Sequence, residues 1–314
     1  MTVRVAAVDC GTNSIRLLVA DLDPDAGTLH DVDRRTEIVR LGEGVDRTGR
    51  LSPVALQRTL AACDRYVAVV RDAGAERVRF VATSASRDVE NRDEFVAGVR
   101  DRFGVDPEVV TGAEEAALSF AGATRELAGA DLARPFLAVD IGGGSTELVL
   151  GDSRADAACS VDIGCVRMTE RHLHDDPPTA AQVAAARRDV EHGLDLAAAT
   201  VPLEAAGTVV GLAGSVTTVA AMALALPTYD PTVIHHARIH SDAVHEVASR
   251  LLTMSKEART ALPFMHPGRV DVIGAGALVL SVVLQRAGAD SVVASEHDIL
   301  DGIAWSCLER APQS

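Results

Sequence analysis

Asp140-Ile141-Gly142-Gly143-Gly144-Ser145-Thr146-Glu147 is a glycine-rich motif near the middle of this sequence. Short apolar runs at 136–139 and 148–150 flank it, so the pattern predicts a strand, a tight glycine turn and a second strand. Successive glycines allow backbone conformations that other residues avoid, and they let a ligand approach the main-chain N–H groups. The bordering acids, Asp140 and Glu147, are oxygen ligands of the kind that hard cations prefer. The stretch indicates a phosphate-binding turn beside a metal ion, although a plain β-hairpin turn has the same pattern.

A second copy of this pattern lies near the N-terminus. Residues 7–17, Ala-Val-Asp-Cys-Gly-Thr-Asn-Ser-Ile-Arg-Leu, align with 138–148, and the Ala, Val, Asp, Gly, Ser and Leu positions agree at the same offsets. Arg16 stands where Glu147 stands in the other copy, so one copy offers a cation for phosphate and the other an acid for metal or water. A repeat on this scale predicts two similar halves, each opening with a strand–turn–strand hairpin.

The repeat predicts an α/β protein with two domains, residues 1–125 and 126–314, and a cleft between unlike halves. The last predicted helix, 298–308, could also pack back on the first domain. At 314 residues and 47% hydrophobic content, the chain is long enough for two cores, and its 3% aromatic content makes them aliphatic.

The charge and cysteine content restrict the function and the compartment. The formal net charge of −15 argues against general binding to nucleic acid or to a membrane surface. The five cysteines include no Cys-x-x-Cys pair and are expected to be reduced. There is no signal-peptide pattern, and the apolar run at 273–284 is too short to cross a bilayer. We therefore expect a cytoplasmic protein.

Two side chains outside the glycine turns are candidates for chemistry. Arg87 follows a predicted buried strand at 77–82, and ligands of open α/β sheets gather at the carboxyl ends of strands. A surface arginine paired with Asp88 or Asp93 is an equal alternative. Glu115 falls in the first turn of a predicted helix and is a candidate general base. An acid near a helix N-terminus is also favourable without any chemistry, so both interpretations of Glu115 stay open.

A third turn, Gly211-Leu212-Ala213-Gly214-Ser215, joins a predicted strand to a predicted helix. Backbone N–H groups at such a helix start can receive an anion, whereas a close strand–helix crossing needs the same small residues. We favour the anion site, with Gly214 and Ser215 as contacts, because it is the third such turn. The spacings of the nearby histidines match no established zinc set, so hydrogen-bonding or surface roles are expected for them. These histidines are His235, His236, His240, His245 and His266.

Six motifs occur in this chain in the order seen in one known family. They are Asp9-x-Gly-Thr-Asn-Ser, Gly112-x-Glu-Glu-Ala, Asp140-x-Gly-Gly-Gly-Ser-Thr-Glu, Gly164-x-Val-Arg, Gly211-x-x-Gly-Ser-Val-Thr-Thr and Arg269-Val-Asp-Val-Ile-Gly-Ala-Gly. Together they resemble the exopolyphosphatase/guanosine pentaphosphate phosphohydrolase (Ppx/GppA) family over essentially the whole chain, in its short two-domain form. The resemblance implies duplicated ribonuclease-H-like domains of the sugar kinase/actin superfamily.

The resemblance also implies an activity and its cofactor. The implied reaction releases terminal orthophosphate from inorganic polyphosphate, or the 5′ γ-phosphate from guanosine pentaphosphate (pppGpp), with Mg²⁺ or Mn²⁺. We favour short-chain polyphosphate because the extra C-terminal domains of longer members are absent from the sequence. The family further leads us to expect a homodimer. A sugar or acetate kinase of the same superfamily, or a non-catalytic polyphosphate or alarmone sensor, are the alternatives of other classes.

Roles for particular residues follow from the resemblance. It places Glu115 at the family's proposed base and Arg87 at a phosphate-contacting arginine. It makes Asp140 a metal ligand and Glu147 a metal or water-positioning acid. We expect Asp9 to assist at the metal through water. The phosphate-binding residues that complete the predicted set are Gly11, Thr12, Asn13, Ser14, Arg16, Gly142, Gly143, Gly144, Ser145, Gly214 and Ser215.

Two departures from the family pattern affect these expectations. Ser215 stands where Thr is more usual, a change that keeps the hydroxyl. The run Ser295-Glu296-His297-Asp298 replaces what is often a less acidic approach to the last helix.

Overall fold

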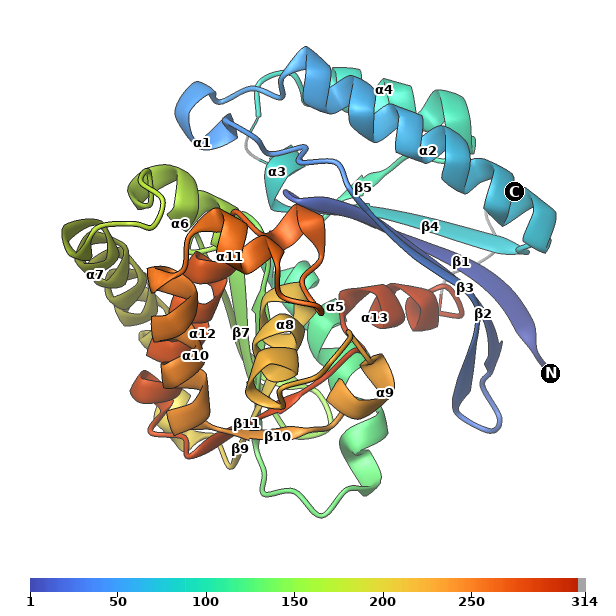
Figure 1. Cartoon of the computed structure of the whole chain (residues 1–314). Helices are drawn as coiled ribbons and strands as arrows, with labels where there is room; N and C mark the ends of the chain where they lie inside the picture. Colours follow the sequence, from blue (N-terminus) through green and yellow to red (C-terminus); the bar gives the residue numbers. More distant parts are fainter. Residues whose placement is uncertain (88, 310–314) are drawn as a thin grey trace. The chain divides into compact units, whose positions relative to one another are not determined.

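The computed structural model describes residues 1–87 and 89–309, which form two compact units (Figure 1). Unit 1 comprises Met1–Gly122 together with Ile299–Ser314, and unit 2 comprises Ala123–Asp298. The chain therefore leaves unit 1 once, builds the whole of unit 2, and returns to unit 1 for its last helix.

Unit 1 is built on a 5-stranded sheet in the order β3-β2-β1-β4-β5. The first three strands are antiparallel neighbours, while β4 runs parallel to β1 and β5 parallel to β4. The strands are β1 (Val3–Cys10), β2 (Ser14–Asp23), β3 (Thr28–Ile38), β4 (Arg77–Ala82) and β5 (Glu108–Val109). The helices are α1 (Val45–Thr48), α2 (Pro53–Ala73), α3 (Ser84–Arg87), α4 (Arg92–Phe103), α5 (Gly112–Thr124) and α13 (Ile299–Ser306).

Unit 2 repeats this topology in a 6-stranded sheet, ordered β10-β11-β9-β6-β7-β8. Strands β6, β7, β8, β9 and β11 take the places of β1 to β5 with the same directions, and β10 adds an antiparallel edge. The strands are β6 (Phe136–Ile141), β7 (Thr146–Gly151), β8 (Ala155–Val161), β9 (Thr208–Leu212), β10 (Arg238–His240) and β11 (Ser291–Ala294). This common strand order confirms the duplicated α/β fold predicted from the repeat.

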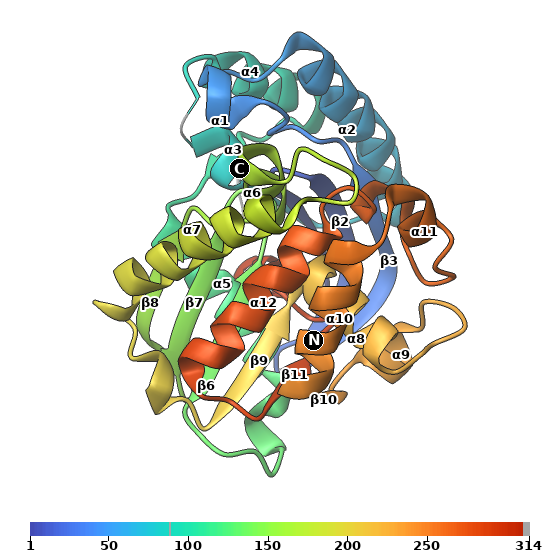
Figure 2. The ribbon, with the colours of Figure 1, turned by 60° about the vertical axis from the view of Figure 1, so that its left-hand side comes forward.

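The helices of unit 2 follow the same plan with additions. They are α6 (Cys165–His172), α7 (Ala180–Ala198), α8 (Ala213–Ala223), α9 (Pro231–Ile234), α10 (Ser241–Thr253), α11 (Lys256–Thr260) and α12 (Ile273–Ala287), with short 3₁₀ turns η1 (Glu126–Gly129), η2 (Leu203–Ala205) and η3 (Pro267–Arg269). Figure 2 shows α10 and α12 side by side in front of the sheet. The aliphatic side chains of α12 are buried with those of β6 in one core, as expected for an apolar run in that position.

Both faces of the sheet in unit 1 are covered, so the middle of its central strand, from Val5 to Val8, is apolar on both sides. Ala6 and Val8 of β1 pack in the core beneath α2 and α4, whereas Val5 and Ala7 pack with α13 (Figure 1). Side chains alternate between the two faces of a strand, and a strand covered on both faces therefore has no polar side.

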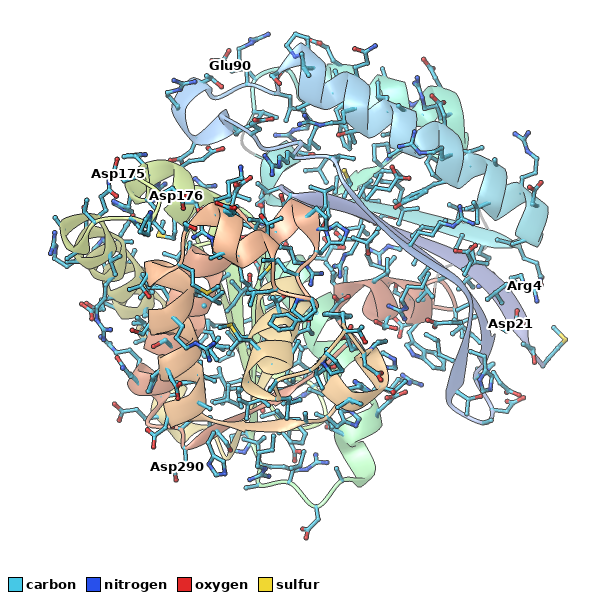
Figure 3. The ribbon with its side chains drawn as sticks, in the orientation of Figure 1. Arg4, Asp21, Glu90, Asp175, Asp176 and Asp290 are labelled. Atoms are coloured by element: carbon cyan, nitrogen blue, oxygen red, sulfur yellow. The ribbon has the colours of Figure 1, made fainter. Side chains whose placement is uncertain are left out.

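Charged side chains fix the strand edges and the last helix of unit 1. Arg4 and Asp21 lie opposite each other on β1 and β2, and the Nε–Oδ1 distance between them is 2.8 Å (Figure 3). Arg34 of the edge strand β3 donates to Asp301 of α13 at 2.5 Å, and Asp301 is only 2% exposed. Arg79 of β4 donates to Ser306 at 2.6 Å. These contacts tie α13 to the unit that begins the chain.

Three elements differ from what the sequence pattern predicts. The pattern predicts two short strands at 28–30 and 37–41, whereas Thr28–Ile38 is one strand, because the charged residues of an exposed edge strand obscure the alternation of apolar and polar positions. Helix α8 begins at Ala213 rather than at the predicted Val219, and Ser84–Arg87, predicted as part of a loop, forms the short helix α3. Within residues 1–87 and 89–309, no helix is both long and apolar enough to span a bilayer.

Candidate functional site

The N-terminal turn of unit 1 is held by its carbonyl groups. The carbonyl oxygen of Asn13 accepts hydrogen bonds from the N–H groups of Val39 and Arg40, at 3.1 and 2.9 Å, and that of Thr12 accepts from Gly42 at 2.9 Å. The Thr12 hydroxyl lies 2.9 Å from that of Ser84. The segment after β3 therefore fixes the turn between β1 and β2, a role that no local sequence motif indicates.

The glycine turn of unit 2 is held in the same way by helix α6. The N–H groups of Cys165 and Val166 donate to the carbonyl oxygens of Gly142 and Gly143 at 2.9 and 2.8 Å. The C=O and N–H of a trans peptide unit point in opposite directions. Because α6 binds the carbonyl side, the N–H groups of Gly143 and Gly144 point away from the helix and can receive an anion.

Arg167 holds the third carbonyl of this turn. Its Nε donates to the carbonyl oxygen of Gly144 at 2.7 Å, and its side chain is only 16% exposed. Asp162, 3.5 Å from the same guanidinium, is 66% exposed. An exposed salt bridge is the simpler interpretation of Arg167 from the sequence alone, but in the structure the residue supports the glycine turn.

The two hairpins differ at one cross-strand pair. Asp9 faces Arg16 across β1 and β2, and the Nε and Nη2 of Arg16 donate to Asp9 Oδ2 at 2.9 and 2.6 Å. At the equivalent position of unit 2, Asp140 faces Glu147 across β6 and β7. Directly opposed like charges destabilise a sheet, whereas opposite charges stabilise it. A bound cation in unit 2 would thus replace the charge that Arg16 supplies in unit 1.

The carboxylate of Glu147 is held by two hydroxyl groups. Ser145 and Ser160 donate to its Oε1 at 2.8 and 2.6 Å, and Glu147 is 1% exposed. Ser160 lies on β8 directly opposite Glu147. Sequence reasoning missed Ser160, because its role depends on the register of β7 and β8, which no local motif encodes.

The structure brings Arg87 and Glu115 into contact. Arg87 Nη2 donates to Glu115 Oε2 at 2.7 Å, and Glu115 is 8% exposed. Arg87 therefore pairs with the candidate base rather than with Asp93, while Asp88 lies outside the described residues. The adjacent Glu114 makes different contacts. Its N–H donates to Thr111 Oγ1 at 3.2 Å, and its carboxylate lies 3.3 Å from Arg79.

The third turn, at the start of α8, is backed by an arginine. A Cβ placed on Gly214 would lie 2.4 Å from Cζ of Arg269, so the glycine allows close approach of the guanidinium to the backbone. Arg269 also donates to Thr218 Oγ1 at 3.1 Å. Ala213 has a φ of 65°, which is uncommon for a residue other than glycine. The close approach of Arg269 requires a small residue at Gly214 and also places a cation beside the turn, so an anion at Gly214 and Ser215 stays a prediction.

A tyrosine and a cysteine lie close to this turn. The Tyr229 hydroxyl lies 2.7 Å from Thr217 Oγ1 and from Glu296 Oε1. Burial, and next the charge of Glu296, raise the pKa of Tyr229 to about 12. Burial also raises the pKa of the Cys165 thiol at the start of α6. Both groups therefore stay protonated at neutral pH and serve as hydrogen-bonding supports.

The duplicated sheets define an actin-like ATPase-type fold, and each sheet opens with a hairpin turn whose N–H groups can receive an anion such as phosphate. The Ppx/GppA phosphatase family model matches residues 18–311. The chain is 54% identical to Exopolyphosphatase 2 of Mycobacterium tuberculosis, covering 96% of this chain and 98% of that protein. The chain belongs to the Ppx/GppA phosphatase family.

Solved structures of related proteins have the same fold. The crystal structure of an exopolyphosphatase-like protein has a TM-score of 0.92 and 44% identity, covering 96% of this chain and 97% of that one. The Aquifex aeolicus member of the Ppx/GppA family has a TM-score of 0.79 and 28% identity, covering 99% of this chain and 100% of that one.

Gly164 is predicted to be essential to the shape of the glycine turn. A Cβ at this position would lie 2.4 Å from the carbonyl carbon and oxygen of Gly143, which are backbone atoms that cannot move aside cheaply. We expect Gly164→Ala to lower the free energy of unfolding by about 1–3 kcal/mol, measured by urea denaturation. Gly129→Ala is the matched control, because no atom lies within 4 Å of its added Cβ. Equal stability of the two variants would contradict the role of Gly164.

Proposed function

We propose that this protein is an exopolyphosphatase that hydrolyses the terminal phosphoanhydride bond of inorganic polyphosphate and releases orthophosphate. The observation that carries the proposal is the full-length similarity to Exopolyphosphatase 2 of Mycobacterium tuberculosis. The buried Asp140–Glu147 pair beside the glycine turn supports it, since phosphoryl transfer depends on positioned N–H groups and charge stabilisation.

In this proposal the glycine turn of unit 2 binds the terminal phosphate. The N–H groups of Gly143 to Ser145 donate hydrogen bonds to its oxygens, with Gly142 allowing the close approach. The turn of unit 1 offers the N–H groups of Thr12 to Ser14 to phosphate oxygens in the same manner, with Gly11 allowing the close approach. Arg16 and Arg87 are cations of the kind that offset the negative charge developing on equatorial oxygens. The contact with Glu115 uses one of the five N–H groups of Arg87, so the same guanidinium can also contact phosphate.

A divalent metal ion fits the acidic pair of unit 2. Asp140 and Glu147 are buried oxygen donors on opposed strand positions, which places their carboxylates within reach of one ion. These residues would hold Mg²⁺ or Mn²⁺, which would neutralise charge on the phosphate chain. Asp9 would have to share its carboxylate with Arg16, so we assign it at most a water-mediated contact.

Glu115 is proposed as the general base. It is nearly buried and oriented by Arg87, and it lies in the first turn of α5. Its carboxylate accepts the proton of the attacking water while the water oxygen bonds to phosphorus and the bridging oxygen leaves with the shortened polyphosphate. Ser145 and Ser160 keep Glu147 in one orientation during this step.

A phosphate-release assay without any acceptor tests the proposal. Purified protein with Mg²⁺ is given tripolyphosphate, long-chain polyphosphate or guanosine pentaphosphate in parallel. We expect orthophosphate from polyphosphate at a higher kcat/KM than from guanosine pentaphosphate. The reverse order would instead identify a guanosine pentaphosphate phosphohydrolase. Release only with ATP and a sugar or acetate acceptor would identify a kinase, and binding without release would identify a sensor.

Glu115→Gln should lower kcat by about 10²- to 10³-fold while leaving polyphosphate binding within a few-fold, because the amide keeps the shape but cannot accept the proton. Single-turnover phosphate release and equilibrium binding measure the two effects separately. Glu114→Gln is the control, since that neighbouring acid is 44% exposed and pairs with Arg79. Near wild-type turnover in Glu115→Gln would remove this residue as the base.

Asp140→Asn should raise the Mg²⁺ concentration needed for half-maximal activity by about tenfold or more, because one negative ligand is lost. The measurement is a Mg²⁺ titration of phosphate release at saturating polyphosphate. Asp162→Asn is the control, because its 66% exposed carboxylate lies near the same turn without facing Glu147. An unchanged titration curve in Asp140→Asn would count against the ligand role.

A further inference from the structure

Three residues that are far apart in the sequence form a compact cluster in unit 2. Glu126 belongs to η1, His235 follows α9, and His297 follows β11. His235 Nε2 and His297 Nδ1 each lie 3.2 Å from Glu126 Oε2, and the three atoms all lie within 4.8 Å of one another. We call these three residues the His–Glu cluster. The phosphate-handling site described above uses none of them.

The cluster has the ligand set of a transition-metal site. Two imidazole nitrogens and one carboxylate are the ligands that suit Zn²⁺ and similar ions, with a fourth position open to water. Metal bonds of about 2.0–2.1 Å in a tetrahedral site put neighbouring ligand atoms about 3.3 Å apart. The two histidine–glutamate separations, 3.2 Å each, match this value, and the two histidine nitrogens lie within 4.8 Å of each other.

Sequence spacing could not reveal this site. His235 and Glu126 are 109 residues apart, and the third member comes from the end of the last strand of unit 2. Zinc motifs are recognised from ligands close together on one hairpin or helix. The unusual run Ser295-Glu296-His297-Asp298 supplies His297, and its difference from the family pattern was the one signal in the sequence.

The hydrogen bonds of His235 indicate how an ion would bind. The backbone N–H of Glu296 donates to His235 Nδ1 at 3.2 Å, so the proton of the neutral imidazole lies on Nε2, facing Glu126. When a metal ion binds Nε2, the proton on Nε2 is lost. The neutral imidazole then carries its proton on Nδ1, which can no longer accept the hydrogen bond from the Glu296 N–H. Losing one backbone hydrogen bond makes binding weaker than in closed cysteine sites, so a micromolar Kd is expected rather than a nanomolar one.

An ion bound by the cluster would link two segments that are far apart in the sequence. Unit 2 begins at Ala123 and ends at Asp298, so Glu126 and His297 lie on the segments by which the chain enters and leaves this unit. An ion held by both residues cross-links the two segments, with His235 as the third attachment within unit 2.

We propose that unit 2 binds one divalent transition ion of the zinc class through Glu126, His235 and His297, and that this ion ties together the chain segments that enter and leave the unit. The site is independent of the Mg²⁺ proposed at Asp140 and Glu147. Imidazole ligands favour Zn²⁺ and are poor ligands for Mg²⁺, so millimolar Mg²⁺ does not compete.

The test is a Zn²⁺ titration of the full-length, chelator-treated protein against a chromophoric zinc chelator in millimolar Mg²⁺. One equivalent should bind to the wild-type protein, and Co²⁺ in its place should give visible absorption bands typical of a tetrahedral site. His297→Ala and Glu126→Gln should each weaken this binding more than about tenfold. Glu126 is 47% exposed, so its variant should fold even if His297→Ala does not.

His240→Ala is the matched control, because this exposed histidine ends β10 outside the cluster.

Hydrogen exchange supplies a second measurement: Zn²⁺ should slow amide exchange at 123–129 and at 295–298 in the wild-type protein but not in His297→Ala. Zn²⁺ binding that is unchanged in both cluster variants, or that is lost in His240→Ala instead, would overturn the proposal. So would a wild-type protein that binds no Zn²⁺ at micromolar concentration, which would leave the cluster as a hydrogen-bonded group only. Phosphate release is not measured, so the outcome does not depend on the proposed exopolyphosphatase activity.

Discussion

In both hairpin turns the carbonyl groups accept hydrogen bonds from the protein. These hydrogen bonds fix the direction of the N–H groups of the turns. In unit 2 the N-terminus of α6 and the side chain of Arg167 bind the carbonyl oxygens of Gly142 to Gly144. In unit 1 the segment 39–42 does the same for Thr12 and Asn13. Because peptide geometry fixes the N–H opposite the C=O, both turns present donors without any side chain being required.

The duplication places different charged pairs at equivalent positions of the two sheets. Both sheets place an aspartate at the end of the first strand and a second side chain directly opposite, with the same strand order around them. In unit 1 that side chain is Arg16, which neutralises Asp9 within the protein. In unit 2 it is Glu147, so the equivalent position becomes a concentrated negative charge suited to a cation. A single arginine-to-acid difference therefore separates the ion pair of unit 1 from the pair that we propose as metal ligands in unit 2.

The neighbouring acids Glu114 and Glu115 show why position on a helix matters more than residue type. Both lie in the first turn of α5, yet one pairs with Arg79 at 44% exposure and the other is 8% exposed against Arg87. The sequence alone left Glu115 with two equal interpretations. Its burial and its contact with Arg87 support the proposal that it acts as the general base.

The duplicated fold, the two hairpin turns and most of the candidate residues can be predicted from the sequence, because each is encoded locally. Glycines permit the turns, alternation of apolar residues specifies the strands, and the repeat shows that the pattern was used twice. The residues that support these turns and strands are set by tertiary packing. Ser160 reaches Glu147 through strand register, Arg167 reaches Gly144 through the position of α6, and Glu126 meets His235 and His297 across most of unit 2. Contacts of this kind depend on how distant segments pack together, and no short stretch of sequence records that packing.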